Sequence, residues 1–130
     1  MSEQVTGILI DTEANTAKVV TIDNNLAGYY SALNCTCIDI VERTIGKRKK
    51  YFTIVCDDEG LFKADPCVSA VSELFKPMLV GNLFITDFNA DTGDLASLSK
   101  REAKYVLDHI VFTVSARRNT PFPLLCQVGY

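Results

Sequence analysis

The sequence predicts a single α+β domain, in which two to three helices pack against one face of a mainly antiparallel sheet. The chain has 130 residues, 48% of them hydrophobic, which suffices for one buried core and leaves little room for a second domain. Most of its apolar runs are short and end at clusters of turn-forming residues, as β-strands do. Two further stretches repeat their apolar residues at helical spacing, which adds helices to the predicted sheet.

The first half of the chain predicts strands at residues 5–10 and 17–22, joined by the turn-forming sequence DTEANT. A helix is expected next, over LAGYYSAL, because its two leucines and two tyrosines fall on one helical face. One of the polar residues 23–25 would cap its start, and Asn34 would end it. Gly28 weakens this helix by about 1 kcal/mol relative to alanine, so we expect a neighbouring backbone to pass close to it.

Two alternating strands, at residues 37–43 and 51–56, flank the most basic stretch of the chain. They place four consecutive cations at the tip of a β-hairpin, where Gly46 can adopt the turn conformation. Four adjacent like charges repel one another, so these side chains are expected in solvent rather than in the core. The four cations are Lys47, Arg48, Lys49 and Lys50.

The next stretch is predicted to run from a turn at residues 57–60, through a short strand at LFK, to a short helix over residues 66–75. Asp65 would cap this helix and Pro77 would end it. One strand is then expected over residues 78–88, followed by a turn at NADTGD and a short strand at LASLS.

Ser99 and Glu102 form a capping box, the strongest local signal in the chain. Apolar residues recur behind it at helical spacing, so a helix is expected from Lys100 to Val111. The tail, residues 119–130, is apolar and contains two prolines, and we expect it to be extended and to pack on the domain or on a second copy. So much apolar surface is rarely left exposed at a chain end, which predicts a homodimer.

Composition narrows the setting in which the protein acts. With 13 basic and 16 acidic residues the net charge is −3, which argues against general DNA binding, because that needs a broad cationic face. No apolar run approaches the roughly 20 residues of a membrane span, and no secretion signal is recognisable, so neither a membrane partner nor export is expected. The odd number of cysteines, five, fits a reducing cytoplasm rather than a disulfide framework.

No arrangement of residues predicts catalysis or a cofactor. His109, the single histidine, would lie near the end of the last predicted helix, where the helix dipole favours it for structural reasons. Cys35 and Cys37 are too close in sequence for a zinc knuckle, and no matching pair follows. The acidic residues 57–59 fit a turn more simply than a metal site. We therefore expect a protein without catalytic residues, metal or cofactor, which is not an enzyme.

The sequence contains, in this order, the pieces VTIDNNLAGYYSAL, IDIV, IVCDDEGLFK, VGNLFIT and GDLASLS, which together span residues 20–99. In their order these pieces resemble an uncharacterised family of small proteins of unknown function, encoded by bacteriophages and mobile elements. The basic hairpin and the segment after His109 depart from the family's pattern. The resemblance implies no functional residue, but it does imply a setting, which is the cytoplasm of a bacterial host cell.

Two clusters of basic residues form the candidate binding site. The hairpin tip could hold a phosphate, and the tyrosine beside it could stack on a base. Two further cations crowd the start of the last helix, where the helix dipole attracts anions. Both features also fit ordinary solvated surface, on which exposed cations discourage edge pairing. The predicted ligand-binding residues are Lys47, Arg48, Lys49, Lys50, Tyr51, Lys100 and Arg101.

Two functional hypotheses follow from these observations. In the first, the chain is a non-enzymatic phage or mobile-element protein that sequesters a small anionic ligand, such as a host nucleotide signal, as a counter-defence. In the second, it is a protein–protein interaction module that inhibits a host defence or another host complex, and its acidic surface and apolar tail bind the partner.

Overall fold

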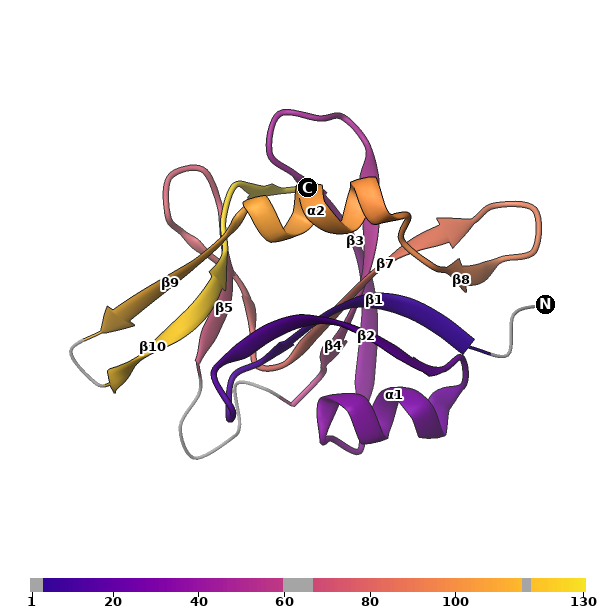
Figure 1. The fold of residues 1–130 in the computed structure, drawn as a ribbon, viewed down its shortest axis with the longest axis horizontal. Coiled ribbons are helices and arrows are strands. Elements are labelled where there is room, and N and C mark those ends of the chain that lie inside the picture. The colour runs from indigo at the N-terminus through magenta and orange to yellow at the C-terminus, as the bar shows by residue number, and fades with distance from the viewer. Residues whose placement is uncertain (1–3, 60–66, 116–117) are drawn as a thin grey trace.

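A computed structural model describes residues 4–59, 67–115 and 118–130, and this part of the chain contains eleven strands and two helices (Figure 1). The elements of the first half are β1 (Gln4–Asp11), β2 (Thr16–Asp23), α1 (Leu26–Leu33), β3 (Ile38–Ile45) and β4 (Tyr51–Asp57). Those of the second half are β5 (Val68–Val71), β6 (Pro77–Val80), β7 (Leu83–Asn89), β8 (Asp94–Ala96), α2 (Lys100–Asp108), β9 (Ile110–Ser115), β10 (Arg118–Leu125) and β11 (Val128–Gly129).

The strands form two sheets. The larger sheet has the order β11-β3-β4-β7-β1-β2. A seventh strand, β8, pairs with the C-terminal end of β7. Each pairing described in this sheet is antiparallel. The smaller sheet has the order β6-β5-β10-β9, and its β5–β10 pair is parallel. The prediction of an α+β chain with a mainly antiparallel sheet is therefore confirmed.

The two helices lie on opposite faces of the larger sheet, so the prediction that the helices pack on one face is wrong. Successive residues of a strand point to opposite faces, and the central strands are apolar on both. Ile8 and Ile85 pack into a core with α2, whereas Leu9 and Phe84 pack into a core with α1. In Figure 1, α2 and α1 accordingly flank the β1–β2 pair from its two sides.

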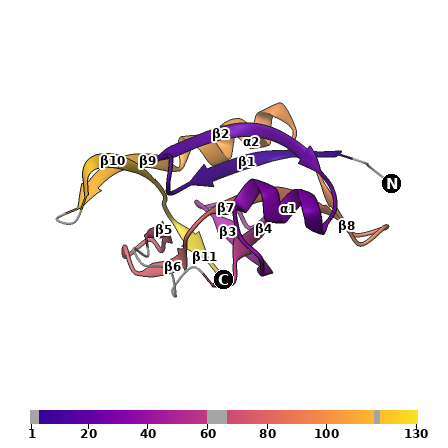
Figure 2. The ribbon, with the colours of Figure 1, turned by 90° about the horizontal axis from the view of Figure 1, so that it is seen from below.

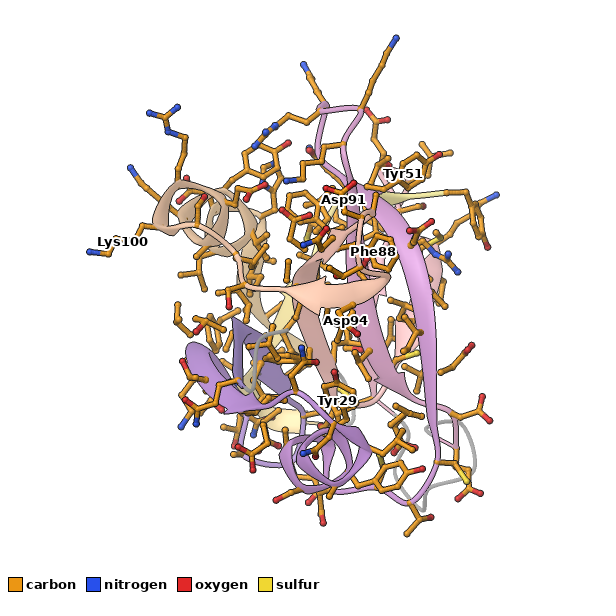
Figure 3. All side chains as sticks on the ribbon, turned by 90° about the vertical axis from the view of Figure 1, so that its right-hand side faces the viewer. Tyr29, Tyr51, Phe88, Asp91, Asp94 and Lys100 are labelled. Carbon is orange, nitrogen blue, oxygen red and sulfur yellow. The ribbon has the colours of Figure 1, made fainter. Side chains whose placement is uncertain are left out.

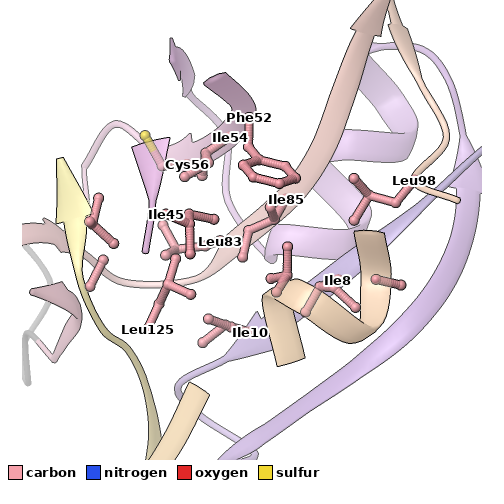
Figure 4. Packing of buried hydrophobic residues seen from close by; sticks show 14 residues of the cluster. Ile8, Ile10, Ile45, Phe52, Ile54, Cys56, Leu83, Ile85, Leu98 and Leu125 are labelled. Carbon is pink, nitrogen blue, oxygen red and sulfur yellow. The ribbon is translucent and has the colours of Figure 1, made fainter. Parts of the chain in front are cut away.

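The core on the α2 side is the larger one and extends into the second sheet (Figure 4). The strands β1, β4 and β7 contribute to both cores, which makes them the centre of the fold. The buried members on the α2 side are Ile8, Ile10, Ile45, Phe52, Ile54, Cys56, Ala70, Leu83, Ile85, Leu98, Ala103, Val106, Leu125 and Val128. Those on the α1 side are Val5, Leu9, Tyr29, Leu33, Val55, Phe84 and Leu95.

Local turn and cap signals of the first half are confirmed. β1 pairs with β2 and β3 pairs with β4 as two antiparallel hairpins, and Gly46 at the second tip has a φ of 68°. The N-cap of α1 is Asn25, whose side-chain oxygen accepts a hydrogen bond from the Gly28 amide at 2.8 Å. Asn34 ends the helix in the left-handed conformation, with a φ of 51°.

The predicted helix over residues 66–75 is wrong, because the described part of this segment forms strand β5 and a turn. Three consecutive residues of β5 are buried, a pattern typical of a strand covered on both faces. Leu74 and Phe75, which completed the helical pattern, are exposed in the turn, and Phe75 has a φ of 61°. The predicted strand LFK and the helix cap lie among residues 60–66, outside the described residues.

The single strand predicted over residues 78–88 is in fact two strands, β6 and β7, which belong to different sheets. Gly81, with a φ of 85°, and the buried Asn82 separate them. The side-chain oxygen of Asn82 accepts hydrogen bonds from the amide and the hydroxyl of Thr12, at 2.7 and 2.8 Å. Its amide nitrogen donates to the Leu33 carbonyl at 2.9 Å. One buried amide thus joins the β1–β2 turn to the end of α1.

The helix predicted from Lys100 to Val111 begins where expected but ends earlier. Ser99 is the N-cap, and its hydroxyl oxygen accepts a hydrogen bond from the Glu102 amide at 3.1 Å. The helix ends at Asp108, because the next apolar residues belong to β9. Ile110 and Val111 fit the helical spacing in the sequence, but they are the first residues of the strand that follows the helix.

The C-terminal tail is extended, as expected, and forms β10 and β11. Phe122, Leu125 and Val128 are buried within the same chain. The apolar surface from which the homodimer was predicted is therefore covered within one copy, and the homodimer stays a prediction. Figure 2 shows that the β9–β10 hairpin extends away from the body of the protein. Exposed apolar side chains lie on its edge strand β9, at Val111, Phe112 and Val114.

Gly28 provides a test of the packing around α1. A methyl group at this position would overlap the backbone carbonyl of Asp23, which confirms that a neighbouring backbone passes close to it. We expect Gly28→Ala to lower the free energy of unfolding, measured with urea, by about 1–3 kcal/mol, because overlap outweighs the better helix propensity of alanine. The exposed Ser31→Ala in the same helix is the control and should raise stability by a few tenths of a kcal/mol. A Gly28→Ala protein more stable than the wild type would contradict this packing.

Candidate functional site

The tip of the β3–β4 hairpin folds against the start of α2, and Lys50 connects the two. Its ammonium group donates to the Asp87 carboxylate on β7 at 2.9 Å, and also to the Glu102 carboxylate on α2. The three side chains are partly buried, with exposed fractions of 32%, 24% and 15%. One cation therefore pairs with two carboxylates, which leaves the cluster with a net charge of −1, and it connects the hairpin, the sheet and the helix.

The ionisation of this cluster is set by its mutual hydrogen bonds. Burial alone would lower the pKa of Lys50 and raise the pKa of Asp87, because it penalises both charged forms. Hydrogen bonding and opposite charge outweigh burial, so the pKa of Lys50 is raised and that of Asp87 is lowered. Lys50 was predicted to bind a ligand, but it is charged and already bonded within the chain.

Tyr105 on α2 makes a second connection to the hairpin. Its hydroxyl donates to the Ile45 carbonyl at 2.7 Å, and the Arg48 guanidinium lies 4.8 Å from the centre of its ring. The His109 ring packs on the same tyrosine, with ring centres 4.5 Å apart, where α2 ends. A Cβ atom at Gly46 would lie 2.5 Å from both side chains, so only glycine allows the hairpin to approach this closely.

The other cations of the tip and of α2 are exposed, and we call them the basic surface. Taken with Lys50, Asp87 and the two carboxylates of α2, Glu102 and Asp108, this region holds seven cations against three carboxylates, a charge of +4. The remaining six cations and thirteen carboxylates of the chain give −7, so positive charge is concentrated in this region. The fold thus brings the two predicted clusters together and adds one cation that was not predicted, Lys104. The basic surface consists of Lys47, Arg48, Lys49, Lys100, Arg101 and Lys104.

Tyr51, the remaining predicted site residue, follows the hairpin tip directly but faces away from α2. Along β4 it alternates with Phe52, which points into the core on the α2 side. The Tyr51 hydroxyl instead approaches the backbone carbonyl of Tyr130 at 3.4 Å. In Figure 3, Tyr51 lies on the same side as Phe88, whereas Lys100 projects from α2 on the other side. The fold therefore does not place this tyrosine to stack on a ligand held at α2.

The face of the sheet that carries α1 has a groove that the sequence did not predict. The groove has a volume of about 750 Å³, and it lies between the start of α1, strand β3 and the β7–β8 hairpin (Figure 3). We call it the α1 groove. Its size falls in the range of pockets that bind small molecules or peptide side chains. The residues that line it include Leu26, Tyr29, Ile40, Glu42, Phe88 and Asp94.

The α1 groove combines apolar walls with acidic groups. The Tyr29 hydroxyl donates to the side-chain oxygen of Asn24. Burial, and then the negative charge of Asp94, raise the pKa of Tyr29 above its ordinary value. The phenol therefore stays neutral, and Asp94 and Glu42 supply the negative charge of the groove. No sequence pattern indicated this site, because its residues come from segments that only the sheet brings together.

Two of the five cysteines, Cys56 and Cys67, belong to the interior of the protein. Burial, followed by the nearby charges of Asp39 and Asp58, raises the pKa of the Cys56 thiol to about 11, which makes it a poor nucleophile. Cys56 and Cys67 are buried, as expected of small core residues. Among the residues that the structure describes, no three His, Cys, Asp or Glu side chains are grouped so that they could hold a metal ion.

The described chain is thus an α+β domain with a basic surface on one side and an acidic groove on the other. The model of a family described as a domain of unknown function, DUF3846, matches residues 5–110, and the chain belongs to this family. No curated protein and no solved structure matches the chain. Neither helix in the described residues is long and apolar enough to cross a membrane. The phage or mobile-element origin stays a prediction.

The Lys50 cluster predicts a pH-dependent loss of stability. We expect Lys50→Met to lower the free energy of unfolding at pH 7 by about 1–3 kcal/mol, because two carboxylates lose their cation. Because the pKa of Asp87 is lowered, its contribution is present above its ordinary pKa of about 4 and is lost as the pH falls through its value in the folded protein. Urea unfolding at pH 7 and at pH 3 should therefore show a smaller difference between wild type and variant at pH 3.

The control for this variant is the exposed neighbour Lys49→Met, which should change stability by less than about 0.5 kcal/mol at either pH. If Lys50→Met and Lys49→Met have equal effects, Lys50 does not hold the hairpin to α2.

Proposed function

We propose that this chain is a non-enzymatic binding protein that captures a small phosphate-bearing ligand, such as a nucleotide, on its basic surface. The observation that carries this proposal is the contact between the hairpin tip and α2. Glu102 would otherwise place an unpaired negative charge among the exposed cations, but Lys50 pairs with it from within the fold. The charge of the basic surface is therefore left for solvent or for a ligand.

The side chains of the basic surface suit phosphate. Arg48 and Arg101 can each hold two phosphate oxygens through their planar guanidinium groups, and the lysines act as mobile point charges. The start of α2 adds the partial positive charge of a helix N-terminus. The rest of the chain, at −7, repels anions, so a polyanion would bind here rather than elsewhere.

Recognition in this proposal relies on phosphate rather than on the base. Tyr51 is on the other side of the sheet, and the ring of Tyr105 is already covered by Arg48 and His109. In the described residues, neither tyrosine is therefore placed to stack on a base held beside the start of α2. Ligands with several phosphates should bind more tightly than those with one.

The cellular role we propose follows from the setting that the sequence suggested. A phage or mobile-element protein with this surface would act in the bacterial cytoplasm as a counter-defence, by sequestering a host nucleotide signal. The poorly reactive thiol of Cys56 and the structural position of His109 support a binding role rather than a catalytic one.

Isothermal titration calorimetry tests the proposal with ATP, ADP-ribose, cyclic di-GMP and inorganic tripolyphosphate as probes. We expect at least one probe to bind with a dissociation constant of about 1–100 μM at low salt. Its affinity should fall as salt is added, because exposed charges are screened. If none of the four probes gives heat at low salt, the proposal fails, even if the basic surface then captures an acidic protein from a lysate.

Paired variants locate the binding site. The double variant Arg48→Gln with Arg101→Gln should weaken binding by about tenfold or more, because it removes two charge-assisted contacts. The matched control, Lys18→Gln with Lys76→Gln, removes the same charge from exposed positions on β2 and before β6, and should change affinity by less than about twofold. Equal losses in the two double variants would show that only net charge matters.

A further inference from the structure

The α1 groove exposes more apolar side chain than an ordinary surface does. Leu26 is 57% exposed, Ile40 49% and Phe88 42%, and they come from three different elements around one concavity. Single exposed apolar residues are normal, but three that line a common groove indicate a surface that is covered by something else. The groove is separate from the basic surface, because α1 and α2 lie on opposite faces of the sheet.

The charges of the groove define what could cover it. Glu42 from β3 and Asp94 from β8 both line the groove, so it carries two carboxylates. Arg43 also lines it, so the lining carries one cation against two carboxylates, a net charge of −1. The Arg43 guanidinium is held by the Tyr130 ring, 4.8 Å from its centre, and by the Glu42 carbonyl, to which it donates at 2.8 Å. The net negative charge beside apolar walls favours a ligand that combines a cation with apolar groups, and it disfavours the phosphates proposed for the basic surface.

We propose that the α1 groove binds a short extended segment of a partner protein in which a lysine or arginine lies between apolar residues. The apolar side chains would cover Leu26, Ile40 and Phe88. The cation would pair with Glu42 and Asp94, which complement its charge.

The neighbouring sheet edge explains why we expect binding across the groove rather than addition of a strand. Strand β11 pairs with β3 only at Thr44 and Ile45, so the rest of that edge is open in the described residues. Two of its backbone groups are nevertheless occupied. The Ile40 amide donates to the side chain of Asp39 at 2.9 Å, and the Glu42 carbonyl accepts from Arg43. Side chains that occupy edge groups in this way protect against strand addition, so the contacts of the partner would be made by side chains.

Fluorescence anisotropy with three synthetic peptides tests this proposal. The probe alternates Leu with Lys, the second peptide replaces each Lys by Glu, and the third replaces each Leu by Ser. We expect the Leu-Lys peptide to bind with a dissociation constant of about 10–100 μM, and each of the other two to bind at least about tenfold more weakly. Absence of binding by the Leu-Lys peptide, or equal binding by the Ser-Lys peptide, would overturn the proposal.

Variants distinguish binding in the α1 groove from non-specific attraction of a basic peptide to an acidic protein. Glu42→Gln with Asp94→Asn keeps the shape of both side chains and should weaken the Leu-Lys peptide by about tenfold. Phe88→Ser should weaken it similarly without changing charge. The control, Asp91→Asn with Glu73→Gln, removes two exposed carboxylates outside the groove and should change affinity by less than about twofold. Equal losses in the groove and control variants would overturn the proposal.

Amide chemical shifts provide a readout that does not depend on the variants. On titration of the Leu-Lys peptide into the unmodified protein, the largest shifts should fall on Leu26, Tyr29, Ile40, Phe88 and Asp94. Largest shifts on the exposed strand β9 would place the peptide elsewhere and overturn the assignment. Failure of the phosphate probes at the basic surface would leave this proposal intact, because the two sites share no residue.

Discussion

The contact between the β3–β4 hairpin tip and α2 depends on one partly buried cation, Lys50. Lys50 leaves the hairpin tip, turns inward and pairs with carboxylates from β7 and α2. Without it, Glu102 would attract the neighbouring cations of its own helix, and the tip would have no ionic connection to the sheet. A positively charged surface on a net-acidic chain is thus maintained by an internal ion pair, in which burial and charge neutralisation act against each other.

The arrangement of the helices divides the molecule chemically. Because β1, β4 and β7 are apolar on both faces, each face needs a cover, and each helix covers only part of one. α2 contributes cations to one side, whereas the short α1 leaves beside it a groove with carboxylates and exposed apolar groups. The positively charged and negatively charged regions therefore lie on opposite faces of the larger sheet.

Local signals in the sequence predicted local structure well. The hairpin tip at Gly46, the caps Asn25 and Ser99 and the tight approach at Gly28 depend on neighbouring residues, and all are confirmed. The failures concern relations between distant segments. The partners of Lys50 lie 37 and 52 positions away, so an exposed cation could not be distinguished from a bonded one. The α1 groove is lined by residues of four segments, none of which has a motif that indicates a binding site.

The hydrogen bonds of Asn82 can form only late in the synthesis of the chain. Asn82 binds groups of Thr12, which lies 70 positions earlier in the sequence. Strand β7 follows Asn82 and lies between β1 and β4 in the sheet. While the polypeptide leaves the ribosome, the first two hairpins and α1 therefore have neither their central strand nor their buried amide. Such long-range closure slows folding, and the nascent N-terminal half exposes apolar strand faces until β7, which ends at Asn89, has emerged.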